Sequence, residues 1–333
     1  MKVAVLGSGS WGTTLALVLY ENGHTVRCWT PETGDIELIR TTGENSRFLP
    51  GVKIPASLVF SDNIAETLKD AAYIVIAVPS HAVRPVIEKC VRVTGSNAVW
   101  ISVAKGIEND TLLRVSQVIE QVGKISPDKI AVLSGPSHAE EVSRHVPTAV
   151  VSASISRDTA KRVQQLFIND YFRVYANLDV IGVEFGGALK NVIALAAGIC
   201  DGAGFGDNTK AALMTRGLVE MNRLGATLGA LPDTFAGLSG IGDLIVTCMS
   251  RHSRNRHVGE QIGKGRKLQE VLAEMVMVAE GVKTTRSAFH LAQTHQVDMP
   301  ITEQVYQTLF ENKPPLEAMR ELMTRASKIE DWG

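Results

Sequence analysis

The sequence predicts an α/β domain built on a doubly wound parallel sheet, followed by an all-α domain. Over the first 180 residues, short β-branched and aliphatic runs alternate with helical spacers, which is typical of parallel strands buried on both faces. Beyond Gly182 such runs nearly vanish, and apolar residues recur with helical spacing between glycine and proline breaks. We therefore predict two domains, residues 1–180 and 181–333, with the boundary within Asn177–Gly182.

The composition is that of an ordinary globular protein, long enough for two cores. Of 333 residues, 45% are apolar and 21% are charged, and the formal net charge is −1. This balance gives no reason to expect nucleic acid or an anionic membrane as a partner. The N-terminus lacks an apolar core for export, and the apolar runs fall short of the ~18 residues of a membrane helix. We expect a cytoplasmic protein without stable membrane insertion.

The cysteines and histidines form no metal-binding pattern. The four cysteines lie far apart without a Cys-x-x-Cys pair, which is typical of free thiols in a reducing compartment. None of the eight histidines has the spacing of a helical zinc motif. We therefore predict no bound metal.

The first 29 residues have the strand–loop–helix–strand order of a dinucleotide-binding unit. Val3–Leu6 predicts a buried strand, Thr13–Glu21 a helix and Thr25–Trp29 the next strand. Between the first strand and the helix, Gly7–Gly12 matches G-x-G-x-x-G in register. This context predicts a Rossmann-type domain that binds a dinucleotide, with the helix N-terminus facing the phosphates.

The three glycines of this loop have separate predicted roles. Gly7 makes the tight turn, Gly9 lets a pyrophosphate approach the backbone, and Gly12 lets the helix pack closely on the strand. All three are candidate cofactor-binding residues.

The end of the second strand usually decides between the two nicotinamide cofactors. An acid there binds the ribose 2′-hydroxyl of NAD, whereas a nearby arginine accommodates the 2′-phosphate of NADP. Here the strand ends at Trp29–Pro31, with neither an acid nor a base at its tip. Arg27 is expected within the strand, and Glu32 lies beyond a proline. The sequence therefore leaves NAD and NADP open.

Further buried runs follow at regular intervals. Those predicted as strands are Tyr73–Val78, Val99–Ala104, Ile130–Leu133, Thr148–Ala153 and Phe172–Tyr175, with helical spacers such as Val83–Val91 and Leu112–Val122. Pro79, Lys105 and Gly135–Ser137 follow three of these strands. Because ligands bind outside the carboxyl ends of parallel strands, we expect these residues to converge on one crevice.

The second half centres on a lysine within an apolar helix. The segments with helical periodicity are Glu184–Cys200, Thr209–Gly225, Thr234–Leu238, Leu268–Met277, Thr284–Thr294 and Ile301–Phe310. Gly186–Asn191 places Lys190 between small residues and the apolar run Val192–Cys200. Burial would lower the pKa of this lysine and make it a proton acceptor near neutral pH. The alternative is a surface lysine that interrupts an apolar run.

Two glycine-rich or basic segments follow. Gly237–Asp243 superficially resembles a phosphate loop, but no strand precedes it. We therefore expect its glycines to permit close packing that presents Asp243, and the alternative is that Asp243 is a helix cap. Ser250–Arg256 is either a solvated basic loop or, through Ser253, Arg254 and Asn255, a set of donors suited to a phosphate monoester.

His138 is a rival base, because it follows Ser134–Ser137 at a strand end. The adjacent Glu140 and Glu141 argue against it, since they are typical of a helix first turn, where a partly exposed histidine is common. His138 is therefore kept only as the second candidate.

Together these motifs closely resemble the bacterial NAD(P)-dependent glycerol-3-phosphate dehydrogenases. The resemblance covers nearly the whole chain and follows the family's order. Its motifs are Gly7–Thr14, Val78–His81, Lys105–Gly106, Ser134–Ser137, Gly186–Asn191, Gly240–Leu244, Ser253–Arg256 and Glu280–Gly281. The chain departs most in Thr30–Asn45, where many relatives carry a basic residue near the second strand's end.

The resemblance implies an oxidoreductase that reversibly reduces dihydroxyacetone phosphate with NAD(P)H. The product, sn-glycerol 3-phosphate, would supply glycerophospholipid synthesis, and Lys190 would be the proton acceptor and donor at C2. With the motifs above, the expected substrate-binding residues are Lys105, Gly135, Ser137, Lys190, Asn191, Asp243, Ser253, Arg254 and Asn255. The expected cofactor-binding residues are Gly7, Gly9, Ser10, Trp11, Gly12, Lys105, Ala139, Arg254, Val278 and Glu280. The family also implies a homodimer.

Two other functions are compatible with the domain order. One is another dehydrogenase with a Rossmann-type and a helical domain, acting on a 3-hydroxy acid or on 6-phosphogluconate. The other is a non-enzymatic nicotinamide sensor, which would leave Lys190, Asp243 and Arg254 without a role. Turnover of reduced cofactor with a panel of ketones separates these alternatives.

Overall fold

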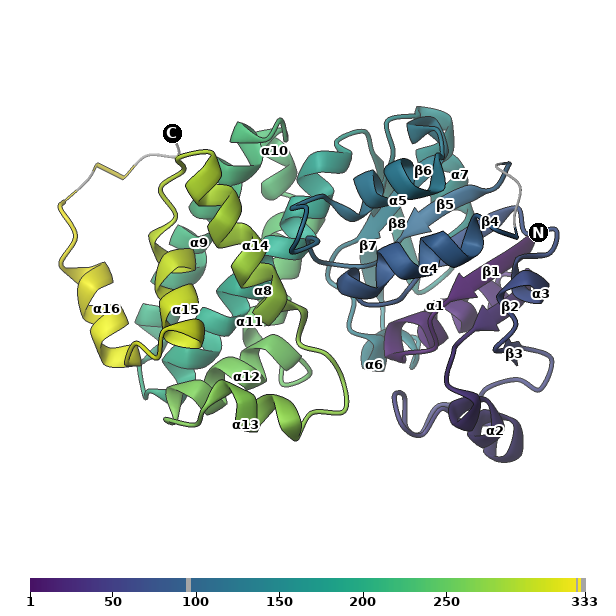
Figure 1. The fold of residues 1–333 in the computed structure, drawn as a ribbon, viewed down its shortest axis with the longest axis horizontal. Helices are drawn as coiled ribbons and strands as arrows, with labels where there is room; N and C mark the ends of the chain where they lie inside the picture. The colour runs from purple at the N-terminus through teal and green to yellow at the C-terminus, as the bar shows by residue number, and fades with distance from the viewer. Residues whose placement is uncertain (94–96, 328, 331–333) are drawn as a thin grey trace. The chain divides into compact units, whose positions relative to one another are not determined.

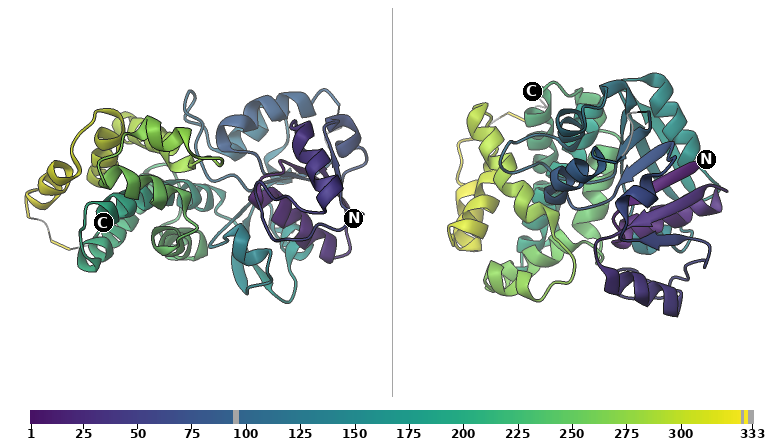
Figure 2. Two further views of the ribbon diagram at one scale, coloured as in Figure 1. Left: turned by 90° about the horizontal axis from the view of Figure 1, so that it is seen from below. Right: turned by 45° about the vertical axis from the view of Figure 1, so that its right-hand side comes forward.

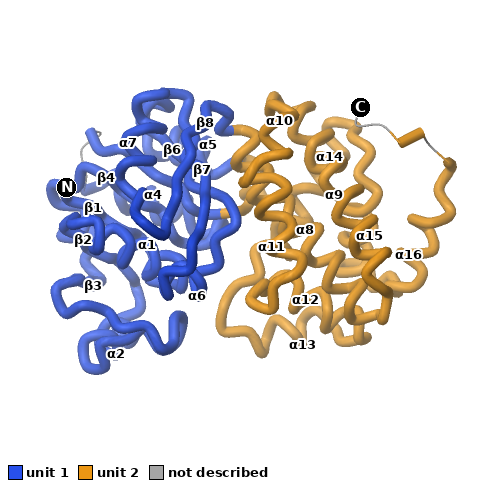
Figure 3. Tube along the Cα trace, turned by 180° about the vertical axis from the view of Figure 1, so that it is seen from behind, with its two compact units in different colours: residues 1–104, 114–180 blue, residues 105–113, 181–333 orange. Residues whose placement is uncertain are grey.

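The computed structural model describes residues 1–93, 97–327 and 329–330, and the chain divides into two compact units (Figures 1 and 3). Unit 1 consists of residues 1–104 and 114–180, and unit 2 of residues 105–113 and 181–333. The segment 105–113 lies in unit 2, although the division predicted at residue 180 places it in the first domain. Lys105 therefore belongs to the helical unit.

Unit 1 contains, among the described residues, an eight-stranded sheet of order β3-β2-β1-β4-β5-β6-β7-β8. The strands are β1 (Lys2–Leu6), β2 (Thr25–Trp29), β3 (Val59–Ser61), β4 (Tyr73–Ile76), β5 (Val99–Ser102), β6 (Ile130–Ser134), β7 (Thr148–Ala153) and β8 (Phe172–Asn177). The strand order reverses between β1 and β4, the kind of switch point at which doubly wound sheets bind dinucleotides. The predicted fold class is confirmed.

One strand pair departs from the predicted parallel sheet. β6 and β7 pair antiparallel, whereas the other neighbours pair in parallel. The connection between them holds only the four-residue helix α6 (Ala139–Val142). A parallel pair would need a longer crossover than this, so the chain returns antiparallel. The short β3 was not predicted, since three residues carry no readable alternation.

Helices flank this sheet in two groups (Figures 1 and 2). Those of unit 1 are α1 (Ser10–Glu21), α2 (Thr33–Thr42), α3 (Ile64–Leu68), α4 (Val83–Cys90), α5 (Val115–Gly123), α6 and α7 (Arg157–Phe167). α1 packs against α6 and α7, and α4 packs against α3 and α5. α5 begins later than the sequence predicts because Leu112 has a left-handed φ of 59°, which a helix does not accommodate.

Among its described residues, unit 2 contains helices joined by loops and no strand of the sheet. Its helices are α8 (Val180–Gly202), α9 (Asp207–Thr227), α10 (Pro232–Phe235), α11 (Asp243–Met249), α12 (Arg254–Gly263), α13 (Leu268–Ala273), α14 (Glu280–Thr294), α15 (Pro300–Phe310) and α16 (Pro315–Met323). Within the described chain, α8 alone is long and apolar enough to cross a membrane, yet 94% of its most apolar window is buried. That pattern is typical of a core helix.

Glycines bring α8 and α12 into backbone contact. A Cβ atom on Gly198 would lie 2.0 Å from the carbonyl oxygen of Arg256, and one on Gly259 would lie 2.1 Å from that of Leu195. No side chain fits at such distances without moving one helix from the other. The crossing therefore holds the start of α12 at a set position against α8, which carries Lys190.

Candidate active site

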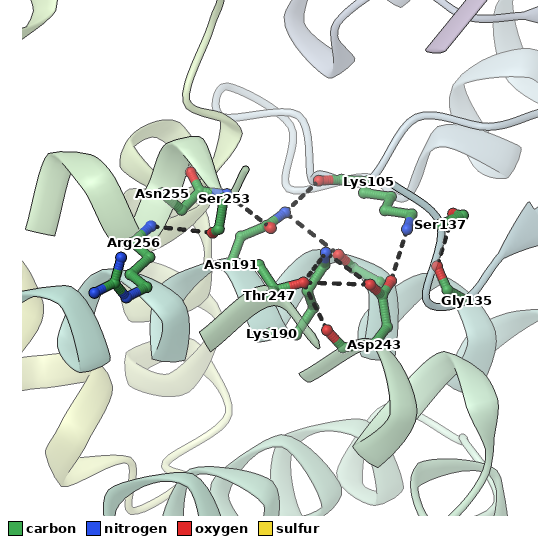
Figure 4. A network of polar contacts seen from close by, with 11 residues as sticks. Lys105, Gly135, Ser137, Lys190, Asn191, Asp243, Thr247, Ser253, Asn255 and Arg256 are labelled. Carbon is green, nitrogen blue, oxygen red and sulfur yellow. Dashed lines mark hydrogen bonds and ion pairs between the residues drawn. The ribbon is translucent and has the colours of Figure 1, made fainter. Parts of the chain in front are cut away.

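The buried lysine of α8 lies in a charged network within unit 2 (Figure 4). Lys190 is only 6% exposed, and its Nζ donates to Oδ1 of Asp243 at 2.9 Å and to Oγ1 of Thr247 at 2.6 Å. The Nζ of Lys105 donates to Oδ2 of Asp243 at 2.7 Å. One carboxylate therefore bridges two ammonium groups, and Lys190 is not the surface lysine of the alternative interpretation.

Close packing of glycines presents Asp243 to Lys190, as the sequence predicts. Asp243 begins α11 directly after a π-helical turn, Leu238–Gly242. A Cβ atom on Gly186 of α8 would lie 2.4 Å from the carbonyl oxygen of Ser239 in this turn. Because residues four apart share a helix face, that contact places the turn beside Lys190. Asp243 uses its carboxylate on two lysines, so it is not a simple helix cap.

Burial sets the ionisation of this network. Desolvation lowers the pKa of Lys190 to about 8, and although Asp243 opposes this shift, the positive charge of Lys105 adds to it. Burial alone would raise the pKa of Asp243, but the two lysines hold it below its usual value. Asp243 is therefore an anion at neutral pH, and Lys190 can exchange a proton near that pH.

A chain of amide hydrogen bonds connects this network to two other elements of unit 2 (Figure 4). Nδ2 of Asn191 donates to the carbonyl oxygen of Lys105 at 3.0 Å. Nδ2 of Asn255 donates to Oδ1 of Asn191 at 2.8 Å, and the backbone N–H of Gly281 donates to Oδ1 of Asn255 at 2.9 Å. The amides thus join Lys105, α8, α12 and the start of α14, and we call them the amide chain.

The basic run Ser250–Arg256 is the entry to α12, not a freely solvated loop. Ser253 is the N-cap, and its hydroxyl accepts from the backbone N–H of Arg256 at 3.2 Å. Arg254 is exposed in the first turn and donates to the carbonyl oxygen of Val278 at 3.0 Å. Arg256 instead pairs with Asp201 at 2.7 Å. The run therefore separates into a structural arginine and an exposed one at a helix N-terminus.

Thr247 is the member of the network that sequence reasoning missed. Its hydroxyl accepts from Lys190 and donates to the carbonyl oxygen of Asp243 at 2.6 Å. The available signal was the spacing: Thr247 stands four residues after Asp243, so the two share one face of a helix. Without the prediction of a helix over Asp243–Met249 (α11), the spacing alone does not place Thr247 beside Asp243.

The phosphate loop of unit 1 has the geometry that the glycine motif predicts. Gly7 has φ +115°, and a Cβ atom there would lie 2.7 Å from the carbonyl oxygen of Ala77. A Cβ atom on Gly12 would lie 2.0 Å from the carbonyl oxygen of Gly7, whereas one on Gly9 meets no atom within 4 Å. The turn thus requires glycine at position 7, and the close packing requires glycine at position 12. The space beside Gly9 is open, so a pyrophosphate can approach the backbone there.

The N-terminus of α1 fits a pyrophosphate group. Gly9 is the N-cap, no side chain caps the helix, and its first turn has no acidic residue. Among the described residues, the buried Nε1 of Trp11 has no hydrogen-bond partner. Ser10 begins the helix, so its backbone lies at the same anion-favouring end. The residues present therefore fit a dinucleotide phosphate.

The segment after β6 also lies in unit 1. Ser137 donates its hydroxyl to the carbonyl oxygen of Gly135 at 2.8 Å. Ala139 begins α6, and its carbonyl oxygen accepts from Oγ1 of Thr14 on α1 at 3.4 Å, which places it beside the phosphate-loop helix. The rival base His138 is the N-cap residue of α6, in unit 1, whereas Lys190 and Asp243 lie in unit 2.

The described residues contain no group of three or more His, Cys, Asp or Glu side chains that could hold a metal ion. All four cysteines are buried free thiols.

A dinucleotide-binding sheet with this phosphate loop, joined to a helical unit that buries a titratable lysine, defines a two-domain nicotinamide-dependent dehydrogenase. Residues 2–160 match the family model of the NAD-dependent glycerol-3-phosphate dehydrogenase N-terminus, and residues 179–320 match that of its C-terminus. The chain belongs to the NAD-dependent glycerol-3-phosphate dehydrogenase family.

Individual relatives agree over the full length. The chain is 54% identical over 331 residues to the NAD(P)+ glycerol-3-phosphate dehydrogenase of Chlorobium phaeobacteroides (strain BS1), with 99% of each chain covered. It is 52% identical over 333 residues to that of Thermoanaerobacter sp. (strain X514), with 100% of both covered. A crystal structure of glycerol-3-phosphate dehydrogenase from Coxiella burnetii superposes with TM-score 0.93 at 38% identity, covering 97% of this chain and 99% of that one. The family predicted from the motifs is confirmed.

Proposed function

We propose that this chain catalyses the reversible reduction of dihydroxyacetone phosphate to sn-glycerol 3-phosphate with NADH or NADPH, supplying glycerophospholipid synthesis. The observation that carries the proposal is the buried Lys190, whose pKa of about 8 lies within reach of neutral pH. It occurs in a chain whose full-length relatives carry the name of this enzyme. A 3-hydroxy-acid or 6-phosphogluconate dehydrogenase has no such support, and a sensor would not need a titratable lysine.

Lys190 is the acid and base of the proposed reaction. When bound, the nicotinamide would supply the hydride for the carbonyl carbon of dihydroxyacetone phosphate, or accept it from C2 of sn-glycerol 3-phosphate. An ammonium carries three protons, and the bonds to Asp243 and Thr247 use two of them. The third is donated to the carbonyl oxygen as negative charge develops there, and neutral Lys190 recovers a proton from the C2 hydroxyl in the reverse direction.

Lys105 and Asp243 control the protonation and the orientation of Lys190. Lys105 adds a second positive charge, which stabilises a developing alkoxide and favours the neutral form of Lys190. Asp243 fixes the directions of both ammonium groups. Through the amide chain, Asn191 and Asn255 fix the positions of Lys105, α8 and α12 relative to one another.

The start of α12 is the proposed binding site for the phosphate group of the substrate. Arg254 lies in its first turn, and the backbone N–H groups at a helix N-terminus favour an anion. Ser253 and Asn255 flank Arg254, but their side chains are engaged by Arg256 and Gly281, so their backbones are the proposed donors. From the resemblance we retain Gly135 and Ser137 as further substrate contacts.

The cofactor is assigned to the phosphate loop of unit 1, with further contacts implied by the family. Gly7, Gly9 and Gly12 shape the loop, and Ser10 and Trp11 begin α1. The remaining proposed contacts are Lys105, Ala139, Arg254, Val278 and Glu280. We also propose a cytoplasmic homodimer, for which the family and the exposed apolar side chains Leu231, Ile245 and Met249 of unit 2 are the support.

The proposal is tested by initial rates of reduced-cofactor oxidation with dihydroxyacetone phosphate. The expected result is rapid, enzyme-dependent turnover that stops without the substrate. Pyruvate, a 3-keto acid and unphosphorylated dihydroxyacetone serve as controls. Faster turnover of any control ketone would assign the chain to a different reaction.

The pH dependence of the two directions should be opposite. Reduction requires protonated Lys190, so its rate is expected to fall as pH rises through about 8. Oxidation of sn-glycerol 3-phosphate requires neutral Lys190, so its kcat/KM is expected to rise through the same pH. Rates measured in both directions between about pH 6 and 10 check this, and a shared direction of change would contradict the role of Lys190.

Arg254→Ala is expected to raise the KM for dihydroxyacetone phosphate by about 10- to 100-fold, because charge-assisted bonds to phosphate are lost. The matched control is Arg251→Ala, which removes an exposed arginine three residues earlier in the same basic run. Steady-state kinetics of both variants distinguish a specific phosphate contact from the general positive field. Equal increases in KM in the two variants would show that only the general positive charge of the basic run attracts the substrate.

A further inference from the structure

The residues that follow β2 place a carboxylate beside the phosphate loop. The backbone N–H of Gly7 donates to the carbonyl oxygen of Trp29, the last residue of β2, at 2.9 Å. Thr30 comes next, is buried, and donates its hydroxyl to Oε2 of Glu32 at 2.7 Å. The backbone N–H of Glu32 points back to the same hydroxyl oxygen at 3.4 Å. Although Pro31 intervenes, this hydroxyl ties the Glu32 carboxylate to the end of β2.

The segment beyond Glu32 is attached to the phosphate loop. Asn45, 1% exposed, donates through Nδ2 to the carbonyl oxygen of Ser8 at 2.7 Å and to Oγ1 of Thr13 at 2.9 Å. Residues 30–45 therefore form a wall on the β2 side of the loop. In doubly wound folds this is the side that receives the adenosine ribose.

The arginines of this region are engaged elsewhere. Arg27 donates to the carbonyl oxygen of Glu66 at 2.7 Å, and Arg40 pairs with Glu37 at 3.3 Å. Arg47 pairs at 3.3 Å with Asp35, which is 7% exposed. Turning Arg47 toward a ligand phosphate would leave that buried carboxylate without its cation, which is costly. The wall therefore presents a fixed acid, and the three arginines within it and on either side of it in the chain already have partners.

We propose that Glu32 makes this chain select NADH over NADPH. The proposal rests on the proposed function, since it concerns the cofactor of that reaction. The carboxylate accepts a hydrogen bond from the ribose 2′-hydroxyl of NADH, and its charge repels the 2′-phosphate of NADPH. A charge-assisted bond of this kind corresponds to about 10- to 100-fold in affinity. Thr30 acts as the positioning residue that directs the carboxylate.

The test is a binding measurement that requires no turnover. Dissociation constants for NADH and NADPH are determined from nicotinamide fluorescence for the unmodified chain and for Glu32→Gln. The same titrations by calorimetry use 5′-AMP and adenosine 2′,5′-bisphosphate, which lack the nicotinamide. Glu66→Gln is the matched control, because it removes an exposed glutamate of unit 1, in α3, and leaves Arg40 paired with Glu37.

The unmodified chain is expected to bind NADH at least about tenfold more tightly than NADPH, and 5′-AMP more tightly than the bisphosphate. Glu32→Gln is expected to reduce both ratios toward one, mainly by strengthening the binding of NADPH and of the bisphosphate, whereas Glu66→Gln leaves both ratios unchanged. Equal or tighter NADPH binding by the unmodified chain, or unchanged ratios in Glu32→Gln, would overturn the proposal. Failure to bind either dinucleotide would instead contradict the proposed function.

Discussion

Lys190→Met is expected to lower turnover of dihydroxyacetone phosphate by about 10²–10⁴-fold, because the reaction loses its proton donor. The change should leave the dissociation constant of NADH unaltered, since Lys190 is not among the proposed cofactor contacts and the phosphate loop lies in the other unit. Steady-state rates and nicotinamide fluorescence measure the two quantities. Turnover within a few-fold of the unmodified chain would remove Lys190 from the proposed mechanism.

The same variant should not lose stability at neutral pH. Folding lowers the pKa of Lys190 from 10.5 to about 8, so the buried ammonium opposes folding by an amount on the order of 3 kcal/mol at pH 7. This opposition fades as pH rises from about 8 to 10.5, where the unfolded chain binds the extra proton. Methionine carries no charge, and Asp243 keeps Lys105 as its partner. Urea unfolding that showed a large loss at pH 7 would contradict this account.

Asp243→Asn is expected to lower the free energy of unfolding by about 3 kcal/mol, the second large effect. The substitution keeps the shape of the side chain but removes the charge between two ammonium groups, 2.7 and 2.9 Å away. Lys105 and Lys190 would then face each other without a buried counter-ion, an arrangement of high cost. Urea unfolding at pH 7 measures the change.

A double variant supplies the control for this prediction. Lys190→Met combined with Asp243→Asn should be destabilised by less than Asp243→Asn alone, because one of the two opposed cations is gone. The difference is the coupling energy of a double-mutant cycle. Strictly additive effects would show that Asp243 stabilises the fold by something other than its charge.

Local patterns predicted most of unit 1 correctly. β2 (Thr25–Trp29) and β7 (Thr148–Ala153) have the predicted bounds, and the geometry of Gly7 and Gly12 is what the glycine motif requires. These features depend on residues adjacent in the chain. The antiparallel pairing of β6 with β7 was not predicted, since it depends on the path of the connection between them.

The helical half was predicted less completely. The long apolar segments became α8, α9, α14 and α15, whereas α11, α12 and α16 were missed. α11 and α12 follow glycine-rich or basic residues that resemble loops in isolation, and tertiary contacts with α8 hold them. Because α11 was not predicted, Thr247 was not among the candidate residues.

By itself, the sequence determined the order of the two units, the phosphate loop, the family and the residues Lys190 and Asp243 as candidates. It could not determine that Lys190 is buried, because burial depends on helices packed from distant parts of the chain. Lys190 and Asp243 stand 53 residues apart, and Lys105 and Asp243 stand 138 apart. Only the tertiary structure brings these charges within 3 Å, and that proximity, with the loss of water, sets the pKa of the lysine.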